Sequence, residues 1–311
     1  MMVVIIPVCM LLTPLIMASL LVWGERRFLA LFQERHGPNR LGPLGLGQLP
    51  ADVIKMFFKQ DWVPPFADKF VFILAPAIIM ATTLLSFMVI PAMPGFVVWD
   101  SSVGLLVFLA LSALGAYSVV LAGWASNNKY ALLGGLRASG QMLAYEVFMG
   151  LSVMGVAARA GSFNLTQIVE SQAGCWNIIP QFLGFVIFYI ASLAETHRTP
   201  FDLAEAESEL VAGFHSEYSG LKFGMFFVGE YIGVTLMSMM MSVLFFGGWQ
   251  GPFISGPWWL LLKTVILIMS FILVRATLPR LRYDQLIKLG WKYLLPLSLL
   301  NLMVTALVIL W

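Results

Sequence analysis

The sequence predicts an all-α polytopic membrane protein with about eight transmembrane helices, an interfacial amphipathic helix and structured cytoplasmic loops. Of its 311 residues 60% are apolar and only 11% are charged, whereas a soluble domain carries roughly 25% charged residues. The mean hydropathy is +0.89, and uncharged runs recur at about the 20 residues that a helix needs to cross a bilayer. This composition excludes a soluble globular enzyme. The net charge of +2, without a basic patch interleaved with aromatic residues, also excludes a nucleic-acid-binding protein.

The uncharged runs define a single integral membrane domain over residues 1–311. Its spans are predicted at 3–24, 70–91, 103–124, 138–158, 178–194, 223–246, 257–276 and 294–311, and its cytoplasmic loops at 25–69, 125–137, 195–222 and 277–293. The first run lacks the basic start and small-residue cleavage site of a signal peptide, so we expect it to be retained. Lys263 and Arg275 lie near opposite ends of the seventh span, where long side chains can reach the interface.

The distribution of charge predicts the orientation. Of 18 basic residues 15 fall in the four loops named above, and only Arg159 falls in an opposite loop. Because positive residues in short loops stay on the cytoplasmic side, we expect both termini to face the outer side of the membrane. Twelve of 16 acidic residues lie in the same inner loops, so function is expected there. The outer loop 247–257 is uncharged and predicts tight turns with an interfacial aromatic residue, Trp249.

The cysteine and histidine residues predict that this chain binds no redox cofactor. Cys9 and Cys175 are far apart and no C-x-x-C motif occurs, which excludes iron–sulfur and zinc sites. His36, His197 and His215 lie outside the predicted spans, so no histidine pair can hold a haem between membrane helices. If the protein handles electrons, their carriers must lie in other chains.

The first inner loop begins with basic residues and ends in an amphipathic segment. Arg26 follows the first span, and glycine and proline then interrupt the chain before a helix predicted over 51–59. Asp52 and Lys55 share its polar face, and Phe57 lies on the apolar remainder, so the helix should lie in the membrane interface. The loop could be an anchor with a surface helix. It could also wall the entrance through which a long hydrophobic molecule leaves the bilayer.

The third inner loop is rich in acidic residues. Pro200 is placed to begin a helix, on which Asp202, Glu205 and Glu209 share one stripe at i, i+3 and i+7. In water these residues would form an ordinary acidic helix start, favoured by the helix dipole. Near a membrane, mutual repulsion and desolvation would instead raise carboxyl pKa values toward neutrality, and such groups can pass protons.

Two further acidic residues, Glu146 and Glu230, lie inside predicted spans, about eight residues from the inner ends. An ionised side chain there costs roughly 2.5 kcal/mol or more, so it is expected to have a function. We predict a proton path from Glu207 and Glu209 to these two carboxyl groups. The structural alternatives are a helix-packing carboxyl between flanking glycines for Glu230 and a hydrogen bond to a neighbouring tyrosine or lysine for Glu146.

These motifs together resemble the family of the quinone-chamber membrane subunit of bacterial NADH:quinone oxidoreductase, respiratory complex I. The resemblance covers the whole chain and is carried by Gly24-Glu25-Arg26-Arg27, Arg35-His36-Gly37-Pro38-Asn39-Arg40, Ala51-Asp52, Arg198-Thr199-Pro200-Phe201-Asp202-Leu203 and Glu217-Tyr218-Ser219. It implies a subunit without a redox cofactor that encloses the membrane end of a quinone chamber and couples quinone reduction to proton translocation. FMN and iron–sulfur clusters are then expected in partner subunits.

The resemblance also assigns residues. It implies a carboxylate path of Glu205, Glu207, Glu209, Glu217, Glu146 and Glu230; chamber residues Glu25, Arg26, Arg35, Asp52 and Phe57; and interface residues Arg198, Asp202, Arg280, Arg282 and Asp284. For the arginines of the last loop, positive-inside anchoring is the alternative. The implied partners are iron–sulfur and quinone-site subunits of the peripheral arm, small and antiporter-like membrane subunits, membrane lipid and quinone, without nucleic acid.

Three alternatives remain open. The first is the related membrane subunit of a proton-pumping hydrogenase, which the stretch from Glu25 to Arg40 and the Asp52 helix disfavour. The second is a free-standing secondary transporter with its site at Glu146 and Glu230, although no internal repeat is found. The third is a purely structural anchor, which would not need acidic residues inside the membrane.

Overall fold

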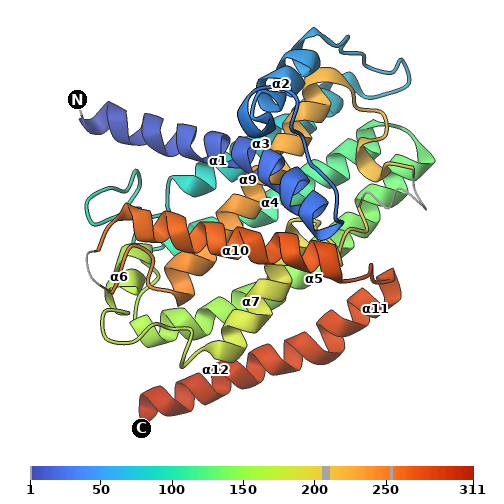
Figure 1. Cartoon of the computed structure of the whole chain (residues 1–311). Coiled ribbons are helices and arrows are strands. Elements are labelled where there is room, and N and C mark those ends of the chain that lie inside the picture. Colours follow the sequence, from blue (N-terminus) through green and yellow to red (C-terminus); the bar gives the residue numbers. More distant parts are fainter. Residues whose placement is uncertain (1, 205–210, 253–254) are drawn as a thin grey trace.

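The fold is a bundle of helices, seen in a computed structural model that describes residues 2–204, 211–252 and 255–311. Within these ranges the structure contains no strand. Most long helices run side by side, and α2 projects from one end of the bundle (Figure 1). The predicted class, an all-α polytopic membrane protein, is confirmed.

Each predicted span overlaps a helix. The helices are α1 (Met2–Phe32), α2 (Gln48–Phe58), α3 (Lys69–Phe87), α4 (Gly104–Ala125), α5 (Lys129–Ala160), α6 (Leu165–Glu170), α7 (Phe182–Glu195), α9 (Gly220–Phe245), α10 (Pro257–Thr277), α11 (Tyr283–Lys288) and α12 (Leu295–Leu310). A π-helical segment, Leu289–Leu294, joins α11 to α12. Among the described residues, α3, α4, α5, α9, α10 and the α11–α12 rod are each long and apolar enough to cross a membrane, and α7 is a shorter apolar helix.

Helix α9 occupies the centre of the bundle and determines where the polar sites lie. It packs against α1, α3 and α10 and also contacts α2 and α7, while α5 packs against α4, α7 and α12. Almost all side chains in the second half of α9 are buried, including Met240 and Phe245. Residues on different faces of α9 therefore meet different neighbouring helices.

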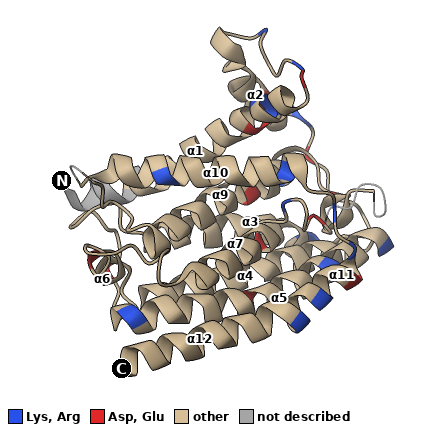
Figure 2. Cartoon of the chain, turned by 60° about the horizontal axis from the view of Figure 1, so that its bottom comes forward, with Lys and Arg blue, Asp and Glu red and all other residues tan. Residues whose placement is uncertain are grey.

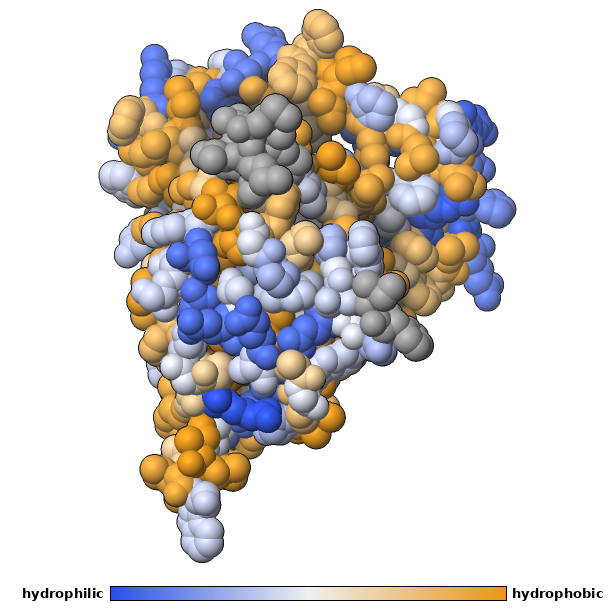
Figure 3. Space-filling model, turned by 90° about the vertical axis from the view of Figure 1, so that its left-hand side faces the viewer, coloured by the Kyte–Doolittle hydropathy of each residue, from blue (hydrophilic) through white to orange (hydrophobic). Residues whose placement is uncertain are grey.

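Charged residues gather at one end of the bundle. Figure 2 shows most of them near α11, in the adjoining loops and on α2, and few at the end where the N-terminus lies. Seen from that end, hydrophilic residues occupy the middle of the surface, with hydrophobic residues above and below (Figure 3). This separation fits a protein that crosses a membrane, because side chains that face lipid are apolar.

Helix α5 begins nine residues earlier than the predicted span. The side chain of Asn128 accepts a hydrogen bond from the Tyr130 backbone N–H and caps the helix at Lys129. Most of the predicted cytoplasmic segment 125–137 is therefore helical, and only residues 126–128 separate α4 from α5. Glu146 lies 17 residues after the first residue of α5 and Glu230 ten after Gly220, the first residue of α9, instead of about eight in each case.

The prediction that Pro200 begins a helix is also wrong. Helix α7 ends at Glu195, and the described residues that follow it, 196–204, form turns. Backbone carbonyls in this segment accept hydrogen bonds from distant groups: the Gln141 amide donates to Phe201 and the Leu281 backbone N–H donates to Pro200. Because these donors satisfy the carbonyls, the segment does not need a helical hydrogen-bond ladder.

The outer loop 247–257 differs from its predicted form. Trp249 is buried, with 4% of its surface exposed, rather than interfacial. Lys263, whose side chain is predicted to reach the interface, is 8% exposed: its ammonium group donates to the carbonyls of Phe246, Gly248 and Gln250 at 2.6, 3.0 and 2.6 Å. The buried lysine thus holds the turn between α9 and α10 together. Within the described residues it is the donor that satisfies these three carbonyls.

Candidate functional site

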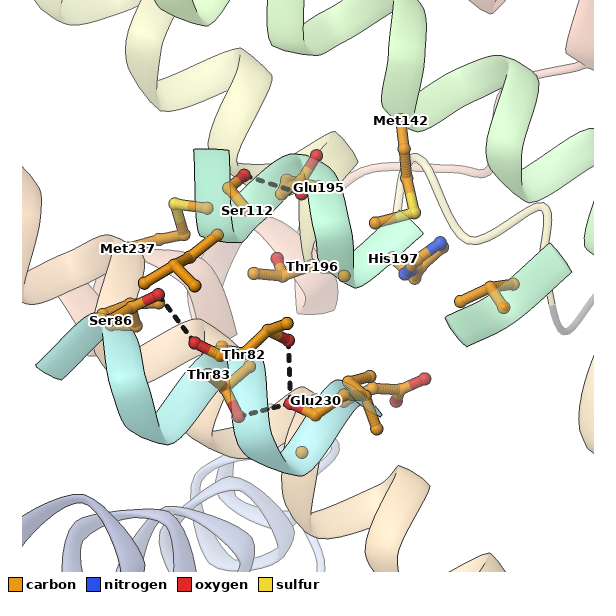
Figure 4. A pocket seen from close by; sticks show the side chains of 17 residues that line it. Thr82, Thr83, Ser86, Ser112, Met142, Glu195, Thr196, His197, Glu230 and Met237 are labelled. Atoms are coloured by element: carbon orange, nitrogen blue, oxygen red, sulfur yellow. Dashed lines mark hydrogen bonds between the residues drawn. The ribbon is translucent and has the colours of Figure 1, made fainter. Parts of the chain in front are cut away.

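A hollow inside the bundle collects the acidic and polar side chains that the apolar helices carry (Figure 4). We call it the carboxyl cavity; it has a volume of about 60 Å³ and lies between α3, α4, α7 and α9, with one residue from α5. Its lining residues with polar side chains are Thr82, Thr83, Ser86, Ser112, Glu195, Thr196, His197 and Glu230. A polar hollow of this size can hold ordered water.

Glu195 is the most enclosed acid of the carboxyl cavity. It is the last residue of α7, and its side-chain oxygen accepts a hydrogen bond from the Ser112 hydroxyl of α4 at 3.0 Å. Glu146 of α5 is close enough for its charge to act on that of Glu195. Sequence reasoning misses Glu195 as a site residue because it stands at the start of a predicted loop.

His197 follows in the turn after α7 and lines the same cavity. Only 7% of its surface is exposed, and its backbone adopts a left-handed conformation with φ of 49°. Burial, together with the neighbouring positive charge of Arg198, lowers the pKa of His197 to about 4. The imidazole is therefore neutral at physiological pH.

Glu230 faces the carboxyl cavity from α9. Seen in the direction of Figure 4, Glu230 and Glu195 lie on different sides of the hollow, with Thr196 between them. Gly229 and Gly233 also line the cavity, and a Cβ atom at Gly229 would approach Ile79 of α3 to 3.2 Å. The small residues therefore let α9 approach α3 closely and leave space beside the carboxyl group.

A second hollow, the α1–α2 cleft, has a volume of about 60 Å³ and lies between α1, α2 and α9. Arg26 and Asp52 form an ion pair at 2.7 Å beside it, and the Gln48 amide donates to the same carboxylate. Burial alone would raise the pKa of Asp52, but these hydrogen bonds and the charges of Arg26 and Lys55 outweigh it and hold this pKa below its usual range. The remaining lining is largely apolar, with Tyr231 on the α9 side.

The outer face of α2 is apolar and uncovered. Its exposed hydrophobic side chains are Val53, Ile54, Phe57 and Phe58. Two-thirds of the Phe57 side chain is exposed, so it points away from the cleft that Asp52 lines. An amphipathic helix with this pattern lies along a membrane surface.

One acid and two arginines form an ion cluster in which Glu25 is buried, Arg198 is largely covered and 37% of the Arg275 side chain is exposed. The Glu25 carboxylate of α1 pairs with Arg198 at 3.3 Å and with Arg275 of α10. The Arg198 guanidinium also lies over the Tyr231 ring, 4.3 Å from its centre. Glu25 is 4% exposed, so this predicted chamber residue lies inside the chain, and only 11% of the Arg198 side chain remains for a partner.

The remaining predicted residues lie on the surface or outside the described ranges. Arg35 lines a shallow hollow with His36, and Glu217 accepts a hydrogen bond from the Asn128 amide at 2.7 Å. Near α11, Arg280 pairs with Asp202 at 3.4 Å, and the exposed Arg282 pairs with Asp284 at 3.1 Å. Glu205, Glu207 and Glu209 lie outside the described residues.

The structure thus brings together residues that are distant in sequence. It joins Glu230 with Glu195 and His197 in one cavity, and Glu25 with Arg198 in one ion cluster. It does not collect the five predicted chamber residues at one point. Within the described residues no cluster of three histidine, cysteine, aspartate or glutamate side chains could hold a metal ion.

Fold and site together define a polytopic membrane protein whose interior carries carboxyl groups and arginines. A family profile described as NADH dehydrogenase matches residues 4–306. The chain is also 60% identical over 296 residues to the H subunit of the NADH-quinone oxidoreductase of Methylococcus capsulatus, a match that covers 95% of this chain and 94% of that relative. The chain therefore belongs to the NADH dehydrogenase family, as the H-type membrane subunit of respiratory complex I. It is a multi-pass inner-membrane component of an enzyme complex, and the other complex I subunits are its partners.

Proposed function

We propose that this chain forms the membrane side of a quinone-binding chamber and couples quinone reduction to proton translocation through its carboxyl groups. One observation carries the proposal. Glu230 and Tyr231 are consecutive residues of α9, yet Glu230 lines the carboxyl cavity and Tyr231 lines the α1–α2 cleft. A charge that develops in the cleft beside Tyr231 therefore lies next to the helix position of Glu230, an acid inside the membrane.

The α1–α2 cleft has the features that a quinone needs. Its lining is largely apolar, as a ring with a long hydrophobic tail requires, and Arg26 supplies hydrogen-bond donors for the ring carbonyls. The exposed apolar face of α2 offers the tail a path from lipid along Val53 and Phe57. Quinone-site and iron–sulfur subunits of the peripheral arm complete the chamber, and their clusters supply the electrons, with FMN further along that arm. This chain contributes no redox cofactor.

Reduction of a quinone to a quinol takes up two electrons and two protons. The electrons come first to an oxygen atom of the ring, so negative charge develops near Tyr231 and the Glu25–Arg198 pair before protons arrive. This charge raises the proton affinity of carboxyl groups close by, because like charges disfavour ionisation. Glu230, Glu195 and Glu146 then titrate as a coupled group.

The path begins on the inner side and ends in the membrane arm. Glu205, Glu207, Glu209 and Glu217 of the third inner loop supply protons to the carboxyl cavity, and antiporter-like subunits receive the resulting signal or protons. Arg282 and Asp284 are exposed at the same end of the bundle, so with Arg280 and Asp202 they form the surface for the peripheral subunits. Both termini lie on the opposite, periplasmic side.

The test uses the whole complex in sealed vesicles. We expect Glu230→Gln and Glu146→Gln to lower the number of protons moved per NADH oxidised, because an amide cannot carry a proton. Glu170→Gln is the matched control, since Glu170 is exposed on the short helix α6, and it should leave that ratio unchanged. If both variants pump protons as the unmodified complex does, the carboxylate path is wrong.

A further inference from the structure

One buried titratable group of the carboxyl cavity has no part in the function proposed above. His197 lines the cavity together with two carboxyl groups, that of Glu195 two residues before it and that of Glu230 on α9. More than nine-tenths of the residue is buried, and within the described part of the chain its Nε2 atom has no hydrogen-bond partner. A buried ring nitrogen without a partner is costly, so it needs a function or a water molecule.

We propose that His197 relays protons between Glu195 and Glu230 through water held in the carboxyl cavity. The proposal rests on the proposed function, and it adds a neutral group to the carboxylate path. A neutral imidazole has one N–H donor and one acceptor nitrogen, so it can accept a proton on one side and release another on the other side.

The transfer is balanced without any electron movement. The O–H bond of protonated Glu195 breaks and an N–H bond forms at the acceptor nitrogen of His197. The original N–H bond of the ring then breaks, and an O–H bond forms on the Glu230 carboxylate, each step through a water molecule. The imidazole ends neutral with its proton on the other nitrogen, and exchange with cavity water returns it to the first tautomer.

The charges around His197 make its cationic form short-lived. Arg198, the next residue, opposes a second positive charge, while Glu195 from α7 and Glu230 from α9 favour it. Glu146 of α5 acts on Glu195 rather than on the ring. The imidazole is therefore neutral between transfers and carries a second proton only while one passes through it. His197 has a left-handed backbone in the turn after α7, and Met142 of α5 lines the same cavity as its ring.

The experiment is chemical rescue in the assembled complex, reconstituted in sealed vesicles. We expect His197→Ala to slow proton translocation about tenfold, less than the full contribution of a positioned acid–base group because water remains in the cavity. Added imidazole should restore the rate, since the missing side chain leaves room for it. Met142→Ala is the matched control: it enlarges the same cavity without removing a titratable group, and imidazole should not change its rate.

A second variant at the same position is needed in case the complex with His197→Ala does not assemble. His197→Asn keeps a hydrogen-bonding group near the Nδ1 position but cannot accept a proton, and it should show the same loss as His197→Ala. If both variants translocate protons normally while Glu230→Gln does not, the relay is wrong and the carboxylate path stands. If Glu230→Gln and Glu146→Gln are also without effect, the proposed function itself fails.

Discussion

Arg26 at the inner end of α1 and Asp52 on α2 form an ion pair with 2.7 Å between nitrogen and oxygen. This pair, with the Gln48 amide on the second carboxylate oxygen at 2.9 Å, fixes α2 beside α1. No residue of α2 is fully buried, so packing alone contributes little to its position. The polar side of the α1–α2 cleft therefore depends on one carboxylate.

We expect Asp52→Asn to loosen α2. Because 43% of the Arg26 side chain is exposed, the pair contributes only about 0.2–1 kcal/mol, and amide-exchange protection of residues 48–58 should fall by roughly 1.4-fold to fivefold. The pKa of Asp52 is lower in the folded protein than its ordinary value of 3.8, so the contribution is complete above this pH and is lost as the pH falls through the folded pKa. Lys55→Ala removes a weaker, 3.8 Å contact of the same carboxylate and should change the protection much less. Equal protection in Asp52→Asn and the unmodified complex at pH 7 would contradict this account.

The buried His197 should make the protein sensitive to mild acid. Burial and the charge of Arg198 lower the pKa of His197 from 6.5 to about 4. Between these two pH values the imidazole is protonated in the unfolded chain and neutral in the folded chain. This difference leaves the free energy of unfolding unchanged above pH 6.5 and lowers it by about 3 kcal/mol in total as the pH falls from 6.5 to 4. His197→Asn should remove this decline, which thermal unfolding of the purified complex at several pH values measures. If the midpoint of thermal unfolding falls equally with decreasing pH in the variant and in the unmodified complex, the His197 ring is not held neutral.

Removing the acid of the buried ion cluster should be more damaging than removing an exposed charge. In Glu25→Gln the guanidinium groups of Arg198 and Arg275 lose their common carboxylate, which costs about 3–5 kcal/mol when a buried pair is broken. We expect less assembled complex and a lower midpoint of thermal unfolding. The double variant Glu25→Gln with Arg275→Met should recover part of the loss, because one uncompensated charge is gone. A double variant less stable than Glu25→Gln would rule out charge imbalance as the cause.

Lys263 allows a test at the opposite end of the bundle. In Lys263→Met three backbone carbonyls lose their ammonium donor, at about 1–3 kcal/mol for each one left unsatisfied, and the Trp176 ring loses the cation 4.6 Å from its centre. Amide exchange of residues 246–250 should accelerate, whereas the rate of quinone reduction should change little. Lys292→Met, at an exposed lysine, is the control and should not alter exchange in the loop.

The helices and two acids inside them, one of which lines the carboxyl cavity, can be predicted from the sequence. A lipid-facing helix must be apolar over its whole length, so hydropathy alone locates α3, α4, α9 and α10 within a few residues. Glu146 and Glu230 stand out because a charge inside such a run is rare. The predicted span covers only part of α5. Lys129 and Arg137 give the first turns of this helix the composition of a loop, but a helix can continue beyond the membrane surface.

The contacts between segments could not be predicted. Glu195 lies at the border of an apolar run, and only the Ser112 hydroxyl of another helix reveals that it faces inward. The turn after α7 is set by donors on Gln141 and Leu281, which are 60 and 81 residues away from Phe201 and Pro200 in the sequence. The local conformational preference of Pro200 therefore does not predict a turn whose carbonyls are satisfied by such distant donors.

The placement of Glu230 and Tyr231 has a mechanical consequence. Consecutive residues of an α-helix are turned by about 100° around its axis, from 3.6 residues per turn, and a rigid helix moves them together. Any rotation of α9 that carries Tyr231 deeper into the α1–α2 cleft must also change the direction in which Glu230 points. Occupancy of the cleft and the orientation of a membrane acid are thus linked by the geometry of one helix, even when no proton passes between the two hollows.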